Sequence, residues 1–188
     1  MNLKKKIENA RKSVFKKAEQ VQGVKIQGPD FNKELSTEEI LNSYEGIGFQ
    51  ASNLAKAIKL VKKMREEKAT IFLAYTSGMI SSGIRDIIRY LVQNKFVDVL
   101  ITTTGGLEED LIKCLKPFVL GKFDEPGKTL REKGVNRIGN IFVPNDRYVM
   151  YEDWINPKLA ELLKMQRSGA NITMSKFVSF LVEEINNP

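Results

Sequence analysis

Apolar residues recur every three to four positions in the first part of the chain, the pattern of amphipathic helices. The first such stretch runs from Leu3 to Val21 with lysines between its apolar positions, and it predicts a helix whose apolar stripe docks on another surface. After a break at 28–30, Ser36 predicts the start of a short second helix. Its hydroxyl can cap the first turn, and Glu38 and Glu39 suit the positive end of the helix dipole.

A predicted loop over 46–50 leads into a third helix, which Ser52 or Asn53 can cap. This helix has one apolar face and one face of lysines, and it fades at 66–68. Its apolar face consists of Leu54, Ala57, Ile58, Val61 and Met64. We therefore expect residues 1–45 to form an N-terminal helical extension to a larger domain.

Two short, nearly continuous apolar runs, 69–75 and 96–101, are typical of strands that are buried on both faces, as in a parallel sheet. Each run leads into a polar turn that contains glycine, at 76–78 and 102–106, and then into a helix with an apolar face. The two helix faces consist of Ile84, Ile87, Ile88, Leu91 and Val92 and of Leu107, Leu111, Ile112 and Leu115. This order predicts a β-α-β-α unit with parallel strands and right-handed crossovers.

The remaining sequence predicts one more strand and two more helices. The run 136–143 reads as a strand that Pro144 stops. A helix opens at 152–157, and Thr173 or Ser175 caps a last helix. Three strands are fewer than a sheet usually has. The predicted fold class is therefore α/β, a parallel sheet that is flanked by helices and incomplete in this chain.

Composition excludes several classes of function. The 188 residues include no histidine, which rules out any triad or acid–base scheme that needs an imidazole from this chain. Cys114 is the only cysteine, so an internal disulfide framework and a Cys-cluster zinc site are excluded. No apolar run approaches the roughly 20 residues that cross a bilayer, and none follows the basic start as in a secretory signal. We expect a protein of the reducing cytosol, the cytoplasm, without a membrane partner.

The net charge of +7 is unevenly distributed. Residues 1–20 hold seven Lys or Arg and two Glu, and so contribute +5 of the total. The remaining sequence is nearly balanced. A basic stripe on one terminal helix is more often a solvated face than a binding surface, so we do not expect nucleic acid to be a partner.

The two glycine-containing turns lie where ligands bind in open α/β sheets, beyond the carboxyl ends of the strands. Residues 76–83 and 102–106 combine hydroxyls with glycines in front of a helix. Glycine lets a ligand approach the backbone, and free amides at a helix N-terminus hold phosphate oxygens. Neither turn is a G-x-G-x-x-G or Walker A motif. Two such turns at equivalent places indicate either a nucleotide pocket or plain turn chemistry.

Three acids, Glu108, Glu109 and Asp110, follow the second turn. They can simply complement the helix dipole. Beside a diphosphate, however, they would repel the ligand unless a cation also binds. Because no spaced second set of oxygen ligands for Mg²⁺ is present, we expect an organic amine rather than a metal site.

Seven segments, in a fixed order across nearly the whole chain, carry a family resemblance. They are Gly28-Pro-Asp-Phe-Asn32, Gly48-Phe-Gln-Ala-Ser-Asn-Leu54, Tyr75-Thr-Ser-Gly-Met-Ile-Ser-Ser-Gly83 with Arg85-Asp86, Thr103-Thr-Gly-Gly-Leu-Glu-Glu-Asp-Leu-Ile-Lys-Cys114, Gly134-Val-Asn-Arg-Ile-Gly-Asn140, Val143-Pro-Asn145 and Glu152-Asp-Trp154. The string that ends at Cys114 and the one around Asn136 are the most specific. On these segments the chain resembles deoxyhypusine synthase.

The resemblance implies a Rossmann-like, NAD-binding domain over 46–188 and an NAD-dependent aminobutyl transfer. Family members oxidise spermidine with NAD and pass its four-carbon amine to an enzyme lysine as an imine. The amine then goes to one lysine of a translation factor precursor, and NADH reduces the product. The resemblance also implies paired homologous subunits, hence an oligomer.

The resemblance places the family's binding residues on this sequence. The cofactor loops fall on Ser77, Gly78, Met79, Ile80 and Ser81 and on Thr103, Thr104 and Gly105. The acidic pair that contacts spermidine and the nicotinamide side falls on Glu108 and Glu109, with Glu109 counted toward the cofactor as well.

The sequence departs from the family pattern in two ways. Gly78 stands where members usually carry a side-chain amide, which loosens one cofactor contact. The chain also ends near the midpoint of known members, before the family's catalytic lysine. We therefore assign no catalytic residue to this chain and expect the isolated chain to be inactive.

Three functions stay open. The first is one half of a split synthase that completes its sheet with a separate chain, because an exposed sheet edge is costly unless paired. The second is a catalytically inactive regulatory paralogue that binds NAD or a full-length synthase subunit. The third is a protein that interacts through its basic helix, which in the family can cover a neighbouring active site and which otherwise packs on its own domain.

Overall fold

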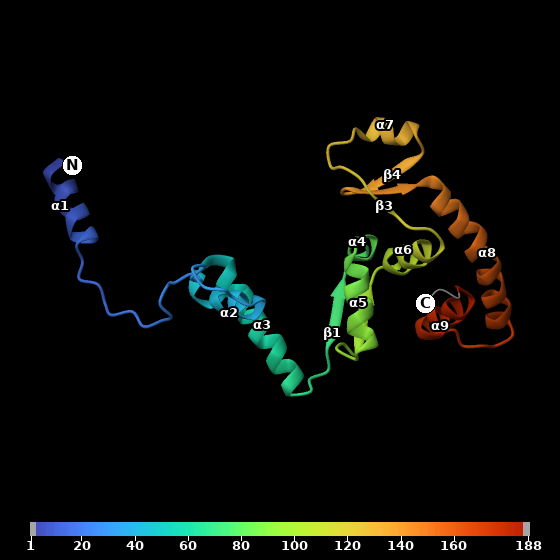
Figure 1. The fold of residues 1–188 in the computed structure, drawn as a ribbon, viewed down its shortest axis with the longest axis horizontal. Helices are drawn as coiled ribbons and strands as arrows, with labels where there is room; N and C mark the ends of the chain where they lie inside the picture. Colours follow the sequence, from blue (N-terminus) through green and yellow to red (C-terminus); the bar gives the residue numbers. More distant parts are fainter. Residues whose placement is uncertain (1–2, 186–188) are drawn as a thin grey trace. The chain divides into compact units, whose positions relative to one another are not determined.

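The computed structural model describes residues 3–185, and the chain forms two compact units, Met1–Lys68 and Ala69–Pro188. The boundary expected after residue 45 lies inside α2 (Thr37–Ile47). This helix packs against α3 (Phe49–Glu66), and the packing ties α3 to the first unit (Figure 1).

The first helix is shorter than its sequence pattern predicts. α1 comprises Leu3–Val14, and residues 16–30 form no helix, so the helix expected to reach Val21 ends at Val14. All residues of α1 are exposed, including its apolar positions. A helix of about a dozen residues is marginal in water unless its apolar face is packed. The apolar spacing alone therefore does not extend the helix.

Ser36 caps α2 as predicted. Its hydroxyl accepts a hydrogen bond from the Glu39 amide at 3.3 Å, and the Glu39 carboxylate accepts one from the Ser36 amide at 2.8 Å. This reciprocal capping box satisfies two amides that the helix itself leaves without partners.

Removal of this cap should cost measurable stability. We expect Ser36→Ala to lower the free energy of unfolding by about 1 kcal/mol, measured by chemical denaturation of the full chain. Ser36→Asp keeps a capping oxygen and is the matched control. An equal loss in both variants would contradict the capping role.

The loop expected over 46–50 is wrong, because only Gly48 separates α2 from α3. Its φ of 90° favours glycine, which lets the chain turn within a single residue. Ser52 and Asn53, the expected caps, lie inside α3. Ser52 still supports the junction: its hydroxyl accepts from the Gly48 amide at 3.0 Å and donates to the Glu45 carbonyl at 2.9 Å.

The second unit contains the predicted β-α-β-α order. β1 (Phe72–Tyr75) and β2 (Val99–Thr102) pair in parallel, with Phe72 opposite Val99. α5 (Ile84–Gln93) connects the two strands, and α6 (Thr104–Leu115) follows β2. This confirms an α/β fold with an incomplete, Rossmann-like parallel sheet.

Both turns after these strands are more helical than expected. The first, expected as a turn at 76–78, leads directly into the five-residue helix α4 (Ser77–Ser81). α6 begins at Thr104, three residues before the apolar periodicity that predicted it at Leu107. Hydroxyl and glycine residues therefore form the first turns of helices rather than loops in front of them.

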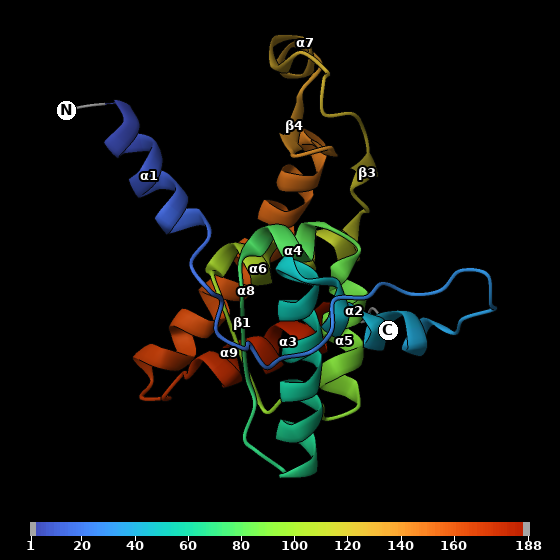
Figure 2. The same cartoon turned by 90° about the vertical axis from the view of Figure 1, so that its left-hand side faces the viewer.

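The strand expected over 136–143 is instead a hairpin. β4 (Val135–Ile138) and β5 (Ile141–Pro144) pair antiparallel, and β3 (Val119–Leu120) joins the outer side of β5. The chain reverses at Gly139, whose φ of 59° lies in the left-handed region. The prediction of a third strand in the parallel sheet is therefore wrong. The short helix α7 (Gly127–Glu132) packs on β4, and Figures 1 and 2 show β4 between α7 and the start of α8 (Asn145–Arg167).

Two helices complete the second unit. α8 begins at Asn145, directly after Pro144 and earlier than expected, and it passes through Pro157 without ending. α9 (Met174–Ile185) follows, and the Thr173 hydroxyl accepts from the Lys176 amide at 3.3 Å, which confirms Thr173 as a cap. The core joins α6, α8 and α9, with its buried members at Leu111, Ile155 and Leu181.

The parallel sheet is thinly covered. Within residues 3–185 it has two strands, and each strand therefore keeps one edge without a neighbouring strand. Phe72 and Ile101 are 62% and 52% exposed, although sheets of this class are usually buried on both faces. In the same range, no helix is long and apolar enough to cross a membrane.

Candidate functional site

The two predicted loops meet at the carboxyl ends of the parallel strands. α4 follows β1, α6 follows β2, and the two helices pack against each other. A Cβ on Gly105 would lie 3.2 Å from the Cβ of Ser77, which is tighter than an ordinary contact. Glycine at 105 therefore permits the first turn of α6 to approach the start of α4.

The predicted cofactor residues differ in accessibility. Gly78 and Met79 are exposed on α4, and Ser77 is half-buried. Ile80 and Ser81 are buried, so their side chains face the protein interior. The hydroxyl-bearing residues of the other loop, Thr103 and Thr104, are exposed, and Gly105 is half-buried.

Glu109 joins the two loops. Its carboxylate accepts a hydrogen bond from the hydroxyl of the buried Ser81, and this contact links α6 to the end of α4. The same hydroxyl lies 3.4 Å from the Ser77 carbonyl. Residues that the sequence assigns to one cofactor site thus lie close together in the folded chain. The Ser81 hydroxyl and the Glu109 carboxylate already form hydrogen bonds within this arrangement.

Both predicted substrate carboxylates lie on α6, which packs against α8. Burial raises the pKa of Tyr148, and the charges of Glu109 and Glu108 raise it further. Burial likewise raises the pKa of Tyr151, with Glu108 adding to the shift. Two acids and two phenol rings therefore share one neighbourhood, which favours a cationic ligand with an aliphatic chain.

A cavity of about 770 Å³ extends along β2, α5, α6 and α9. Its walls are mostly apolar, with Ile88, Leu100 and Phe177 among them. Thr103 and Thr104 line the cavity where β2 passes into α6.

Among residues 3–185 no group of three His, Cys, Asp or Glu side chains could hold a metal ion.

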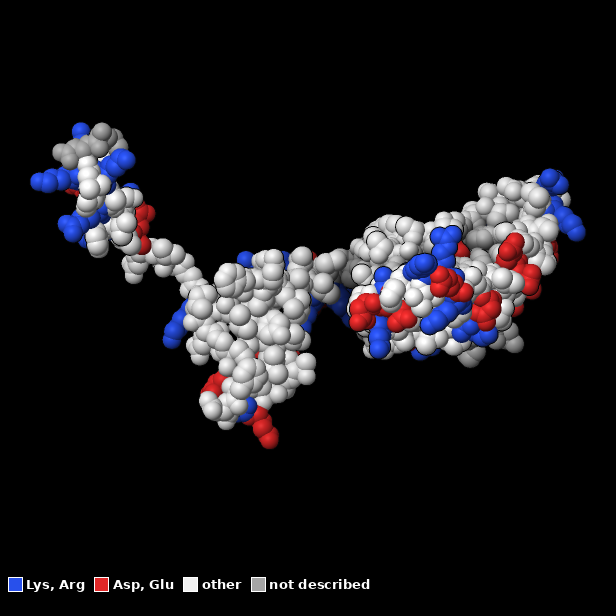
Figure 3. Space-filling model, turned by 90° about the horizontal axis from the view of Figure 1, so that it is seen from above, with Lys and Arg blue, Asp and Glu red and all other residues white. Residues whose placement is uncertain are grey.

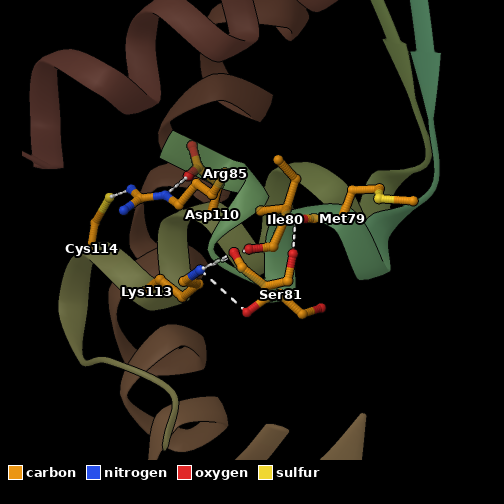
Figure 4. A network of polar contacts seen from close by, with 8 residues as sticks. Met79, Ile80, Ser81, Arg85, Asp110, Lys113 and Cys114 are labelled. Carbon is orange, nitrogen blue, oxygen red and sulfur yellow. Dashed lines mark hydrogen bonds and ion pairs between the residues drawn. The ribbon is translucent and has the colours of Figure 1, made fainter. Parts of the chain in front are cut away.

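Figure 4 shows a polar network that the sequence pattern did not reveal. Lys113 donates to the carbonyls of Ile80, Ser81 and Ser82 at 2.8, 3.3 and 3.0 Å. From the sequence alone, a lysine in a helix is expected at the surface. The available signal was its setting, because Lys113 interrupts the otherwise apolar run from Leu111 to Leu115.

A second part of the network ties α5 to α6. Arg85 forms an ion pair with Asp110 and donates from Nη2 to Cys114 Sγ at 2.9 Å. Burial lowers the pKa of Arg85, but the hydrogen bond and charge of Asp110 outweigh it, so its pKa lies above the ordinary value. Asp110, the third of the three consecutive acids, therefore forms an ion pair within the chain.

The close approach of α6 to β2 gives a testable steric prediction. A Cβ on Gly106 would lie 2.3 Å from Thr102 Oγ1 and 3.2 Å from Thr102 Cβ. We expect Gly106→Ala to lower the free energy of unfolding by about 1–3 kcal/mol, measured by chemical denaturation. Gly127→Ala, where a Cβ meets nothing within 4 Å, is the control. Equal stability of the two variants would show that α6 can shift without cost.

The sequence model described as deoxyhypusine synthase matches residues 39–188 of the chain, which is most of its length. The chain belongs to the deoxyhypusine synthase family. The match includes every predicted site residue of this synthase-family chain and leaves out α1.

Individual members of the family agree with this assignment. A protein of Methanocaldococcus jannaschii described as "Probable deoxyhypusine synthase" is 50% identical over 171 residues, covering 87% of this chain and 52% of that protein. The deoxyhypusine synthase of Senecio vernalis is 47% identical over 208 residues, covering 96% of this chain and 56% of the plant protein.

A crystal structure assigned to the same family, from Entamoeba histolytica, superposes with a TM-score of 0.59 at 28% identity. The superposition covers 86% of this chain and 55% of that structure. The chain therefore spans about half the length of the deoxyhypusine synthases that it matches.

Proposed function

We propose that the protein is a component of an NAD-dependent deoxyhypusine synthase of the cytoplasm. In this role it binds spermidine and NAD, and a complementary chain brings the reactive lysine. The assembly transfers the 4-aminobutyl group of spermidine to a lysine of a translation factor precursor. The carrying observation is that α4 and α6 pack together at the carboxyl ends of β1 and β2. Together with Thr103, the N-cap of α6, these helices hold the residues predicted for both ligands.

The residues present fit a dinucleotide. Exposed hydroxyls at Thr103 and Thr104 stand at the start of the twelve-residue helix α6, whose first amides have no partner within the helix. The exposed Gly78, where a Cβ would meet nothing within 4 Å, leaves room for a ligand to approach the backbone. These groups suit phosphate and ribose oxygens. NAD, when bound, supplies the hydride acceptor for oxidation of the amine.

The carboxylates provide the second half of the site. Glu108 and Glu109 lie on the same turn of α6, and both act on tyrosines of α8 through their charge. They bind the ammonium groups of spermidine and orient its carbon chain. They also offset the positive charge that a polycation brings into a half-buried region.

The reactive amine comes from outside residues 3–185. In that range no lysine lines the cavity, and Lys113 donates its hydrogen bonds to three backbone carbonyls. A lysine must lose its proton to attack a carbon centre. Lys113 is therefore engaged as a donor and does not serve as the nucleophile.

The complementary chain also completes the sheet. A two-stranded parallel sheet with exposed residues such as Phe72 and Ile101 gains stability from another strand and from covering helices. The partner is a chain that carries the C-terminal half of the family fold, and the complex forms a larger oligomer.

The absence of a lysine from the cavity walls of the described residues also favours a second candidate. In this alternative the protein is an inactive regulatory paralogue that binds NAD or a full-length synthase subunit. It would raise or lower the activity of that subunit without contributing to turnover.

Aminobutyl transfer measured by mass spectrometry tests the proposal. The chain is incubated with spermidine, NAD and the translation factor precursor, either alone, with a complementary C-terminal half, or with a full-length synthase subunit. Transfer only with the C-terminal half supports the split enzyme. A change in the rate of the full-length subunit alone supports the regulatory paralogue.

A further inference from the structure

The short helix α4 depends on contacts from outside itself. It has five residues, no side-chain hydrogen bond at its N-cap, and an extended C-cap at Ser82 with φ −82° and ψ 178°. A helix this short is not stable on its own propensity. No glycine cap closes its C-terminus, so its last carbonyls need another donor.

Lys113 supplies that donor from the neighbouring helix. Its ammonium donates to the carbonyls of Ile80 and Ser81, which are labelled in Figure 4, and to the carbonyl of Ser82. A cation at this end also complements the negative end of the helix dipole. One side chain of α6 thus satisfies three consecutive carbonyls where α4 ends.

Lys113 is not the only residue of α6 that holds α4. Glu109 lies one helical turn before it and binds the Ser81 hydroxyl, so two side chains of α6 hold the same residue of α4 from its side chain and from its backbone. The ion pair of Arg85 with Asp110 fixes the start of α5 to the same helix. Contacts from α6 therefore determine the position of the cofactor residues on the exposed part of α4.

We propose that Lys113 is a positioning residue for the cofactor, which holds α4 in register with the start of α6 so that Ser77–Met79 and Thr103–Gly105 face one ligand. This inference rests on the proposed NAD site. Lys113 acts through α4 and has no contact with the reacting atoms.

Burial and nearby charges act in opposite directions on the ammonium group of Lys113. Burial lowers the pKa of Lys113, and the charge of Arg85 lowers it further, while Asp86, Asp110 and Glu109 oppose both effects. A partly buried cation that is not compensated would be costly. The three carbonyls and the three acids offset part of this cost.

The test compares Lys113→Met with Lys113→Arg and with Lys116→Met, a lysine of the same region that pairs instead with Asp146 at 2.6 Å. Hydrogen exchange of the amides of residues 77–82 is measured on the full chain. NAD affinity is measured by titration calorimetry on the chain with its complementary half, and KM for NAD and spermidine by steady-state transfer.

We expect Lys113→Met to accelerate exchange over 77–82 and to weaken NAD binding on the order of tenfold, because small misplacements of a binding element are expensive. KM for NAD should rise while KM for spermidine changes much less. Lys113→Arg should recover part of the affinity, since its guanidinium can also donate to several carbonyls. Lys116→Met should match the unmodified protein.

Unchanged NAD affinity in Lys113→Met would overturn the inference while leaving the proposed function intact. A fall in thermal stability without a change in NAD affinity would equally reduce Lys113 to a structural role. Absence of NAD binding by the unmodified assembly would remove the proposed function, and this inference with it.

Discussion

The isolated chain is expected to transfer no aminobutyl group, whereas the chain mixed with a complementary C-terminal half is expected to modify the translation factor precursor. The reason is chemical: among the described residues no lysine lines the cavity, and Lys113 on α6 donates its hydrogen bonds to the carbonyls where α4 ends. Mass spectrometry of the precursor after incubation with spermidine and NAD measures the transfer directly.

The matched control for this experiment is the C-terminal half alone, which lacks both α4 and α6. It too should be inactive, so that activity requires both polypeptides. Turnover by the isolated chain would contradict the site assignment, because it would require a reactive amine among residues to which we assign other roles.

The largest single-residue effect is expected for Glu109→Gln in the active assembly. We expect kcat/KM for spermidine to fall by about a hundredfold or more, since removing one partner of a desolvated charge pair costs on the order of 2–5 kcal/mol. Glutamine keeps the shape, and its side-chain oxygen can still accept a hydrogen bond from the Ser81 hydroxyl, so the stability of the fold should change little. Steady-state kinetics and chemical denaturation of the same preparation give the two values.

Glu161→Gln, an exposed position on α8, is the control for the loss of one negative charge. It should leave spermidine use unchanged. If Glu109→Gln weakened folding and spermidine use to the same extent, the carboxylate would be a structural link between α6 and α4 and not a ligand for the polyamine.

The concentration of positive charge in the first residues of the sequence is also visible on the surface of the molecule. Figure 3 shows Lys and Arg side chains gathered along the segment of α1, while acidic and basic side chains alternate over the visible face of the second unit. The basic residues of the second unit therefore form no continuous stripe on that face.

Local patterns predicted the parallel strands and their helices because those signals lie within each segment. The apolar runs that contain β1 and β2 and the periodic faces of α5 and α6 follow from spacing alone. The cap at Ser36 is equally local, since both partners lie within four residues. For the same reason the positions of the two strand-end turns could be predicted.

The errors arose where a distant contact or a single glycine decides the structure. The run 136–143 has strand composition throughout, but Gly139 adopts a left-handed φ and splits it into a hairpin. α4 is too short to be predicted by periodicity, and its support comes from Lys113 and Glu109 on another helix. The sequence of α4 itself carries no information on that support.

An open strand edge offers its amides and carbonyls to any extended polypeptide. Within residues 3–185, β1 and β2 each present such an edge beside large apolar side chains. Concentrated solutions of the chain by itself should therefore self-associate and finally precipitate. Synthesis of both halves in the same cell, at the same time, would shorten the interval during which the strand edge has no neighbouring strand.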